Sequence, residues 1–492
     1  MTKRRQGEPR RVNQMPHRIF EIDEILRVIV WYTRDVDTSE VTTVSLACCC
    51  KAFEEPALSL LWVRTYLSGL LHLFPSITTL TTDPTARPTE EEWKRFRRYA
   101  LWIRVLSVNV TSGYATTQEL TLLSLIATQQ ATTTVFPNVC GLTWSGGPSS
   151  LIHLPPFVSP ILTDICVLIA PGRETEHFPE EYAPLAYTIN STISPSNLRS
   201  LSLSTSPRAI PSPELKRAIA NLVLRCGSAL TIFEVEFELP EPVVLHLMSL
   251  PNLKIWRTTQ PTPTELLSSP LRPAVPFPQI ESLNLRTATP QSWLYFINAL
   301  VGTRSHPPHV SHIPAFSFAN LTDFTMDPLD LLGCFDSCTF PLTDSDTSLL
   351  ANTLPYLEHV WLGMPCPFNA CKTTFRSLHS LSTRCPRLKS LCIHINMTTL
   401  VEDIRSLFEG GDQRTETQRI RPGPSGGRRS CPLDFRYAHR LPLEGNVGVG
   451  DLEVVAKGLF NISVTFTMSS ATSDPNSKLW AKVSEGVKAL HA

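Results

Sequence analysis

Cys366, Cys371, His379 and Cys385 form the group of residues whose types could most readily do chemistry. Thiolates and imidazoles are the ligands that zinc prefers, and these four lie within one short stretch. Their spacing is loose, however, and no matching second pair follows, so ordinary core or surface thiols are the simpler interpretation. We therefore expect no metal site and no cofactor.

A cysteine run and two acidic runs are further candidates for chemistry. Cys48-Cys49-Cys50 could suggest redox activity, but three consecutive side chains on a helix point in different directions, so at least one should pack inside. Asp23-Glu24 and Glu90-Glu91-Glu92 could suggest an acid and base pair, but acidic residues are favoured at helix starts, where they stay solvated. The sequence has no phosphate-binding loop and no His-Glu-x-x-His motif. We predict a protein that is not an enzyme.

Two basic stretches could contact RNA or direct nuclear import. They are Lys3-Arg4-Arg5 with Arg10-Arg11, and a Gly/Arg-rich run over residues 410–429. Neither is interleaved with the aromatic residues that stack on bases. Positive and negative side chains also balance at 44 each, which argues against phosphate neutralisation as the main task. We expect residues 1–14 to be a disordered basic tail, 409–431 a disordered loop, and no nucleic-acid partner.

The composition indicates a folded chain of many short elements. Apolar residues make up 42% and charged residues 18%, which excludes a highly charged disordered chain. The 42 prolines disfavour long helices. No apolar run approaches the roughly 18 to 20 residues that cross a bilayer, and the N-terminal stretch is polar. We therefore expect no membrane partner, cytoplasmic and/or nuclear localisation, and reduced thiols for the 13 cysteines.

Three short helices are predicted between about residues 19 and 62. The first has apolar residues on one face. A capping box of Asp37 and Glu40 opens the second, and Glu54-Glu55-Pro56 opens the third. A unit this small buries little apolar surface. We therefore expect an apolar patch on it to stay exposed until a partner covers it. The apolar stripe of the first helix comprises Ile22, Ile25, Leu26, Ile29 and Val30, and that of the second Leu46, Cys49, Cys50 and Phe53.

The order of three motifs in this stretch resembles the F-box, in the divergent form common in fungal families. The motifs run from Phe20 to Ile29, from Ser45 to Phe53, and from Pro56 to Trp62. The chain has Ile22-Asp23 where the family usually has Leu-Pro. The resemblance implies a three-helix F-box domain, residues 15–65, which docks on the Skp-type adaptor of a cullin ubiquitin ligase. A generic helical cap on a repeat domain is the alternative. The implied adaptor-binding residues are Ile22, Ile25, Leu26, Ile29, Leu61 and Trp62.

An L-x-x-L-x-L pattern, with apolar substitutions, recurs a dozen times after the helices, most copies lying 23 to 41 residues apart. Many copies of a weak pattern are a strong signal of a repeat fold. Several copies follow a pair made of proline and a polar residue. The copies begin at Ile77, Ile103, Val139, Leu162, Leu198, Leu230, Leu253, Ile280, Leu321, Leu357, Leu388 and, more weakly, Leu459.

Helix signals lie between the repeated strands. Ser212-Pro213 opens a helix that ends at Cys226-Gly227, and Thr289-Pro290 opens another that reaches Leu300. Strand followed by helix resembles a leucine-rich repeat, in which each repeat buries its apolar face against its neighbours. The fold class is thus an α/β repeat: an irregular leucine-rich-repeat solenoid of short parallel strands with outer helices, residues 66–492, in one continuous stack. The family's conserved asparagine appears only at Asn396, so the turns should be irregular.

Alternation along the strands predicts a substrate surface. If Val360 and Leu362 point into the core, then His359 and Trp361 point outward, where a tryptophan near charged groups is typical of a binding hot spot. A covering segment or a shifted register would instead hide Trp361. The predicted substrate-binding residues are Arg257, Arg286, Asp323, His359, Trp361 and His394.

The resemblance and the repeats together imply the substrate-recognition subunit of a Skp–cullin–F-box ubiquitin ligase. Its partners would be a Skp-type adaptor, the cullin ligase subunits and a protein substrate that the sequence does not identify. The mechanism would be proximity, since tethering raises the effective concentration of substrate near the transferring enzyme. The main alternative is a leucine-rich-repeat interaction scaffold without a ligase link. An RNA-binding repeat protein is disfavoured by the net charge of zero.

Overall fold

The computed structural model describes residues 22–33, 39–78, 87–110, 117–129, 135–169, 182–205, 212–259, 277–287, 294, 318, 320–328, 342–362, 372–393, 400–408, 431–434, 464–467 and 485. The chain divides into two compact units, Met1–Leu162 and Thr163–Ala492. The sequence pattern gave no sign of a boundary at this point, because the apolar repeat runs through it. No helix among the described residues is both long and apolar enough to cross a membrane.

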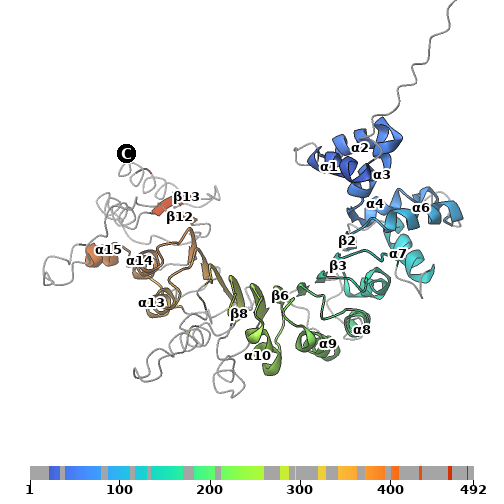
Figure 1. Cartoon of the computed structure of the whole chain (residues 1–492). Helices are drawn as coiled ribbons and strands as arrows, with labels where there is room; N and C mark the ends of the chain where they lie inside the picture. The colour runs from blue at the N-terminus through green and yellow to red at the C-terminus, as the bar shows by residue number, and fades with distance from the viewer. Residues whose placement is uncertain are drawn as a thin grey trace, which may run out of the picture. The chain divides into compact units, whose positions relative to one another are not determined.

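Three helices open the first unit: α1 (Asp23–Thr33), α2 (Ser39–Cys49) and α3 (Lys51–Leu61) (Figure 1). They pack around Leu26, Val30, Phe53 and Ala57, all of which are buried. The predicted boundary between the second and third helices is wrong. Cys50 has extended backbone (φ −160°, ψ 159°) and occupies the N-cap position of α3 without a side-chain hydrogen bond to the helix. Phe53 therefore lies on α3, and Pro56 lies inside that helix rather than at its start. Asp37, predicted to cap α2, lies outside the described residues.

The three strands that the structure describes in the first unit are parallel and pair in chain order. β1 (Arg64–Tyr66) pairs with β2 (Val105–Val110), which pairs with β3 (Gly141–Gly146). The copy of the pattern at Ile77 was predicted as a strand, but Ile77 lies on helix α5 and the first strand precedes it. β1 also crosses the predicted domain boundary at residue 65. The helical elements of this part are α4 (Leu67–Leu71), α5 (Pro75–Thr78), α6 (Glu90–Ala100), α7 (Thr117–Gln129), η2 (Pro148–His153) and η3 (Pro155–Phe157).

Among its described residues, the second unit continues the same plan with eight parallel strands in chain order. Helices α8 (Ala183–Ser191), α9 (Pro213–Arg225) and α10 (Glu241–Ser249) all lie on one side of its strands (Figure 1). Three more helices, α13 (Asp344–Thr353), α14 (Phe375–Arg384) and α15 (Leu400–Phe408), follow later, and β12 (Cys431–Asp434) pairs separately with β13 (Val464–Thr467). The eight strands are β4 (Asp164–Ile169), β5 (Ser200–Thr205), β6 (Ile232–Val235), β7 (Ile255–Thr259), β8 (Ser282–Thr287), β9 (Asp323–Pro328), β10 (His359–Leu362) and β11 (Ser390–Ile393).

The repeated apolar pattern forms the core of both units. In each copy from Ile103 to Ile393, all three patterned residues are buried, including the unusual Thr258. The prediction of short parallel strands with the patterned side chains inward is therefore confirmed for these copies. Of the weak last copy, only Val464 belongs to a described element, strand β13.

Main-chain hydrogen bonds make the entries to the strands regular, without the asparagine that the resemblance to leucine-rich repeats led us to expect. The Thr163 carbonyl accepts the N–H groups of Arg199 (2.7 Å) and Ser200 (3.0 Å), and the Arg199 carbonyl accepts those of Thr231 and Ile232 in turn. The same pairing of one carbonyl with two N–H groups recurs up to the Glu358 carbonyl. Each repeat thus satisfies polar backbone groups of the next, which buried backbone requires. The expectation of irregular turns is wrong at these entries.

Helix α9 forms as its sequence signals predict. The Ser212 hydroxyl accepts the Leu215 N–H at 3.2 Å and caps the helix, and the chain leaves the helix at Cys226. Its apolar face, including Ile219 and Leu222, is fully buried. The second predicted helix, over residues 289–300, lies outside the described residues except for the buried Leu294.

Candidate functional site

The residues predicted to bind an adaptor are only partly exposed. Leu26 is 3% exposed and belongs to the core of the three-helix unit, so the prediction that it stays open for a partner is wrong. Ile22 is exposed, whereas Ile25 and Ile29 are half-buried. A 3.6-residue period shows which residues share a face of α1, but not which face the other two helices cover.

The exposed apolar side chains of α1 lie on a different face from the one predicted. Val28, Trp31 and Tyr32 are 53%, 54% and 71% exposed, at positions i, i+3 and i+4 of the helix. On α2, Val41 and Val44 are also exposed. Sequence reasoning missed these residues. The signal was present, since apolar residues at 28, 31 and 32 flank the buried stripe and give α1 more apolar surface than the three-helix core can cover. Large exposed apolar side chains close together are typical of interaction surfaces.

Trp62 contacts the repeat domain. Its ring lies 4.7 Å from that of Tyr99 on α6, and both Trp62 and Leu61 are half-buried. Tyr99 in turn lies edge-on to Trp102 at 5.3 Å. Trp62 therefore joins α3 to the first repeat and offers at most part of its surface to a partner.

Cys48, Cys49 and Cys50 are all exposed, so the prediction that at least one of them packs inside is wrong. The reason is the break in the chain at Cys50, which ends the regular helical turn that would have carried one thiol inward. Glu92 also differs from its prediction as a solvated helix start. It is buried, and its carboxylate accepts hydrogen bonds from Ser76 and from the Thr89 N–H.

The predicted substrate surface has the expected register. Along β10, His359 is exposed, Val360 and Leu362 are buried, and Trp361 is half-buried. His359 pairs in register with Asp323 on β9, and the Asp323 side chain is half-buried like that of Trp361. The structure therefore brings His359, Trp361 and Asp323 together on neighbouring strands, on the side away from the core.

Arg257 lies in the same row as Trp361, three strands away. Successive register partners link Arg257 to Asn284 on β8, Asn284 to Thr325 on β9, and Thr325 to Trp361. Strands about 4.8 Å apart put Arg257 and Trp361 roughly 14 Å from each other, which is within the span of one peptide ligand. Arg286 belongs to β8, but its side chain lies outside the described part, as does the whole of His394.

Two serine–glutamate pairs on the same side of the strands were not predicted. The Ser202 hydroxyl donates to a Glu234 carboxylate oxygen and the Ser204 hydroxyl to one of Glu236, each at 2.7 Å. Each pair joins residues 32 positions apart in the chain. Burial raises the pKa of the neighbouring Cys166 thiol, and the charge of Glu234 raises it further against a hydrogen bond with Ser202.

The cysteine and histidine residues do not assemble a metal site within the described residues. Burial raises the pKa of the Cys385 thiol to about 11, which disfavours the thiolate that binds zinc. Burial, with a smaller effect of Arg384, lowers the pKa of His379. Cys366 and Cys371 lie outside the described residues, as do both basic stretches.

No protein-family model matches the chain, and no curated protein is similar to it in sequence. The described part of the chain contains a repeat domain of parallel strands with a partly polar outward face. It also contains a small helical unit with exposed apolar side chains. Surfaces of both kinds can bind other proteins.

Proposed function

We propose that this protein is the substrate-recognition subunit of a Skp–cullin–F-box ubiquitin ligase. The observation that carries the proposal is the exposed apolar set Val28, Trp31 and Tyr32 on a three-helix unit that leads directly into a repeat domain. A unit with a four-residue core has little reason to keep two large aromatic side chains in water unless a partner covers them.

In this proposal the helical unit docks on the adaptor, and the outward face of the strands holds the protein substrate. Ile22, with the exposed residues of α1 and α2, would contact the adaptor, while Leu26 would hold the unit together. Burial of each such apolar side chain is worth roughly 1.5 to 3 kcal/mol, and three of them offset much of the roughly 4 to 15 kcal/mol that association costs. The chain itself would perform no chemical step, and ubiquitin would be transferred by other subunits.

Co-purification of the full chain with a recombinant Skp-type adaptor tests the proposal. Tyr32→Asp should abolish capture, because it puts a charge into the covered patch. Tyr187→Asp is the matched control, since Tyr187 on α8 is 68% exposed against 71% for Tyr32. Both variants should keep the circular dichroism and melting temperature of the wild type. If the wild-type chain captures no Skp-type adaptor, the ligase proposal fails.

A leucine-rich-repeat interaction scaffold without a ligase link is the second candidate. It keeps the outward face of the strands as a protein-binding surface and gives the helical unit only the role of an end cap. The ring contact between Trp62 and Tyr99 favours this candidate, since it uses part of the F-box-like motif within the chain. Wild-type protein that binds a substrate but no adaptor would establish the scaffold.

A further inference from the structure

The last two turns of helix α6 carry positive charge that faces solvent. Lys94, Arg95 and Arg98 are exposed and lie on one face of the helix, at positions i, i+1 and i+4. Among the described residues, no carboxylate lies within ion-pair distance of these three, although the exposed Glu91 is only one turn earlier. The other arginine of α6 is instead paired with the glutamate that begins the helix. We call Lys94, Arg95 and Arg98 the basic face of α6.

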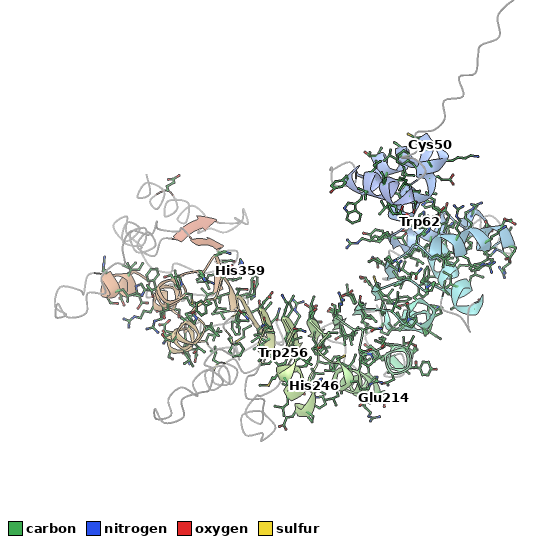
Figure 2. The ribbon with its side chains drawn as sticks, in the orientation of Figure 1. Cys50, Trp62, Glu214, His246, Trp256 and His359 are labelled. Carbon is green, nitrogen blue, oxygen red and sulfur yellow. The ribbon has the colours of Figure 1, made fainter. Side chains whose placement is uncertain are left out.

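One arginine of the basic face lies over an aromatic ring. The guanidinium carbon of Arg98 is 5.5 Å from the centre of the Trp102 ring, which is within the range of a cation–π contact. The Trp102 ring lies 5.3 Å from that of Tyr99, and Tyr99 contacts Trp62, which lies where the three helices meet the repeats (Figure 2). Arg98 is therefore held at the end of a row of three aromatic side chains that belongs to the body of the first unit.

The contact with Trp102 prepares Arg98 to bind an anion. A ring against the guanidinium restricts a long side chain before any ligand arrives, so less conformational entropy is lost on binding. A guanidinium donates two parallel hydrogen bonds to one carboxylate from the edge of its plane, which a contact through its flat face leaves available. Arg98 is thus suited to bind a carboxylate, with the charges of Lys94 and Arg95 beside it.

The size of the basic face suits a short acidic segment of a protein. Four residues of helix rise about 6 Å, so Lys94 and Arg98 are nearly as far apart as alternate residues of an extended strand, about 6.7 Å. Acidic side chains at alternate positions of such a segment can therefore reach both ends of the face. A single-stranded nucleic acid would need free ring faces for its bases, whereas the rings of this row contact one another and Arg98.

We propose that the basic face of α6 docks a short acidic segment of a partner protein, with aspartate or glutamate at alternate positions. The charge of the face and the spacing of its ends define the chemistry of this partner. Exposed ion pairs are individually weak, so the face supplies selectivity for charge and spacing within a larger contact. The docking needs neither an adaptor nor the outward face of the strands, and it therefore goes beyond the proposed function.

Fluorescence anisotropy on the full chain at low salt tests the proposal with three labelled probes. The first is a peptide with glutamate at alternate positions, the second is its glutamine counterpart, and the third is a single-stranded RNA with the charge of the first. The acidic peptide should bind most tightly, and its affinity should fall with added salt. Arg95→Gln/Arg98→Gln should weaken its binding about tenfold. Arg98→Lys keeps the charge but loses the paired N–H groups, so its affinity should lie between these two.

Arg217→Gln/Arg225→Gln is the matched control, because both arginines are exposed on α9 in the second unit and their loss removes the same charge. It should leave the affinity for the acidic peptide unchanged, and both double variants should keep the melting temperature of the wild type. Equal affinity of the wild type and Arg95→Gln/Arg98→Gln overturns the proposal. A loss of the same size in the control overturns it too, since net charge would then be the cause.

Tighter binding of the RNA than of the acidic peptide would also overturn the proposal, because the partner would then be a nucleic acid. Adaptor capture, measured separately, reports on the ligase proposal. Neither result decides the other, since the exposed apolar residues of α1 and the basic face of α6 are changed by different variants.

Discussion

The rings of Trp62 and Tyr99 lie with their centroids 4.7 Å apart and their planes tilted by 32°, and this contact joins helix α3 to helix α6. Trp62→Ala should therefore destabilise the first unit by about 2 kcal/mol, from lost apolar burial and the lost aromatic pair. Chemical denaturation followed by circular dichroism measures this loss. Tyr66→Ala is the control, because Tyr66 is 69% exposed and should have little effect. If Trp62→Ala leaves the stability unchanged, the contact between the two rings does not contribute to the free energy of unfolding.

Leu26→Asp should unfold the three-helix unit rather than only block a partner. Leu26 is 3% exposed among Val30, Phe53 and Ala57, so a carboxylate there would be buried without a partner, at a cost of about 3 kcal/mol or more. Val28→Asp, on the exposed face of the same helix, should leave the unit folded. Limited proteolysis between residues 23 and 61 distinguishes the two variants. Equal protease resistance would contradict the assignment of Leu26 to the core.

Leu201→Asp should disrupt the second unit, whereas Ser200→Asp should not. The two residues are neighbours on β5, but Leu201 is buried and Ser200 points to the other side. The same contrast holds for Leu283→Asp and Ser282→Asp on β8. Melting temperature and soluble yield report the effect. Similar losses in both members of a pair would mean that the strands are buried on both faces.

Trp361→Ala should weaken substrate binding by about 2 kcal/mol with little loss of stability, as expected for a half-buried side chain at a binding hot spot. Trp256→Ala is the contrast, because Trp256 is fully buried on β7 and its loss should cost about 3 to 5 kcal/mol of stability. Calorimetric unfolding and a binding assay with a captured substrate give both quantities. A large fall in melting temperature for Trp361→Ala, with binding unchanged, would make Trp361 a core residue.

Glu92 should make the stability of the first unit depend on pH. Burial raises the pKa of its carboxyl, but hydrogen bonds from Ser76 and Thr89 outweigh burial and hold the pKa below its usual 4.5. A lowered pKa contributes stability above pH 4.5 that is lost as the pH falls through the folded value. At pH 7 the melting temperature of the wild type should therefore be higher than that of Glu92→Gln. The difference between the two melting temperatures should shrink as the pH falls below 4.5.

The matched control for this titration is Glu91→Gln, one residue earlier and exposed. Its melting temperature should follow that of the wild type across the same pH range. If the melting temperatures of the wild type and Glu92→Gln differ by the same amount at all pH values, the stabilisation by the Glu92 hydrogen bonds does not depend on the charge of the carboxylate.

The strand register could be predicted from the sequence alone. Alternation fixes which side chains share a face of a strand, and the apolar first, fourth and sixth positions of each copy fix which face is inward. His359 and Trp361 were therefore placed outward correctly, beside Asp323. The capped start of α9 at Ser212 is equally local, because a cap and the first turn lie within four residues.

Other features were decided only by the tertiary structure, because they depend on what covers a face and on what lies one repeat away. The α1 stripe was identified from its period, but only packing against α3 shows that Leu26 is inside and Trp31 outside. The bonds from Ser202 to Glu234 and from Ser204 to Glu236 span 32 residues, and the repeat spacing is too variable to align them by counting. Sequence periodicity defines faces, whereas the contacts between faces come from the fold.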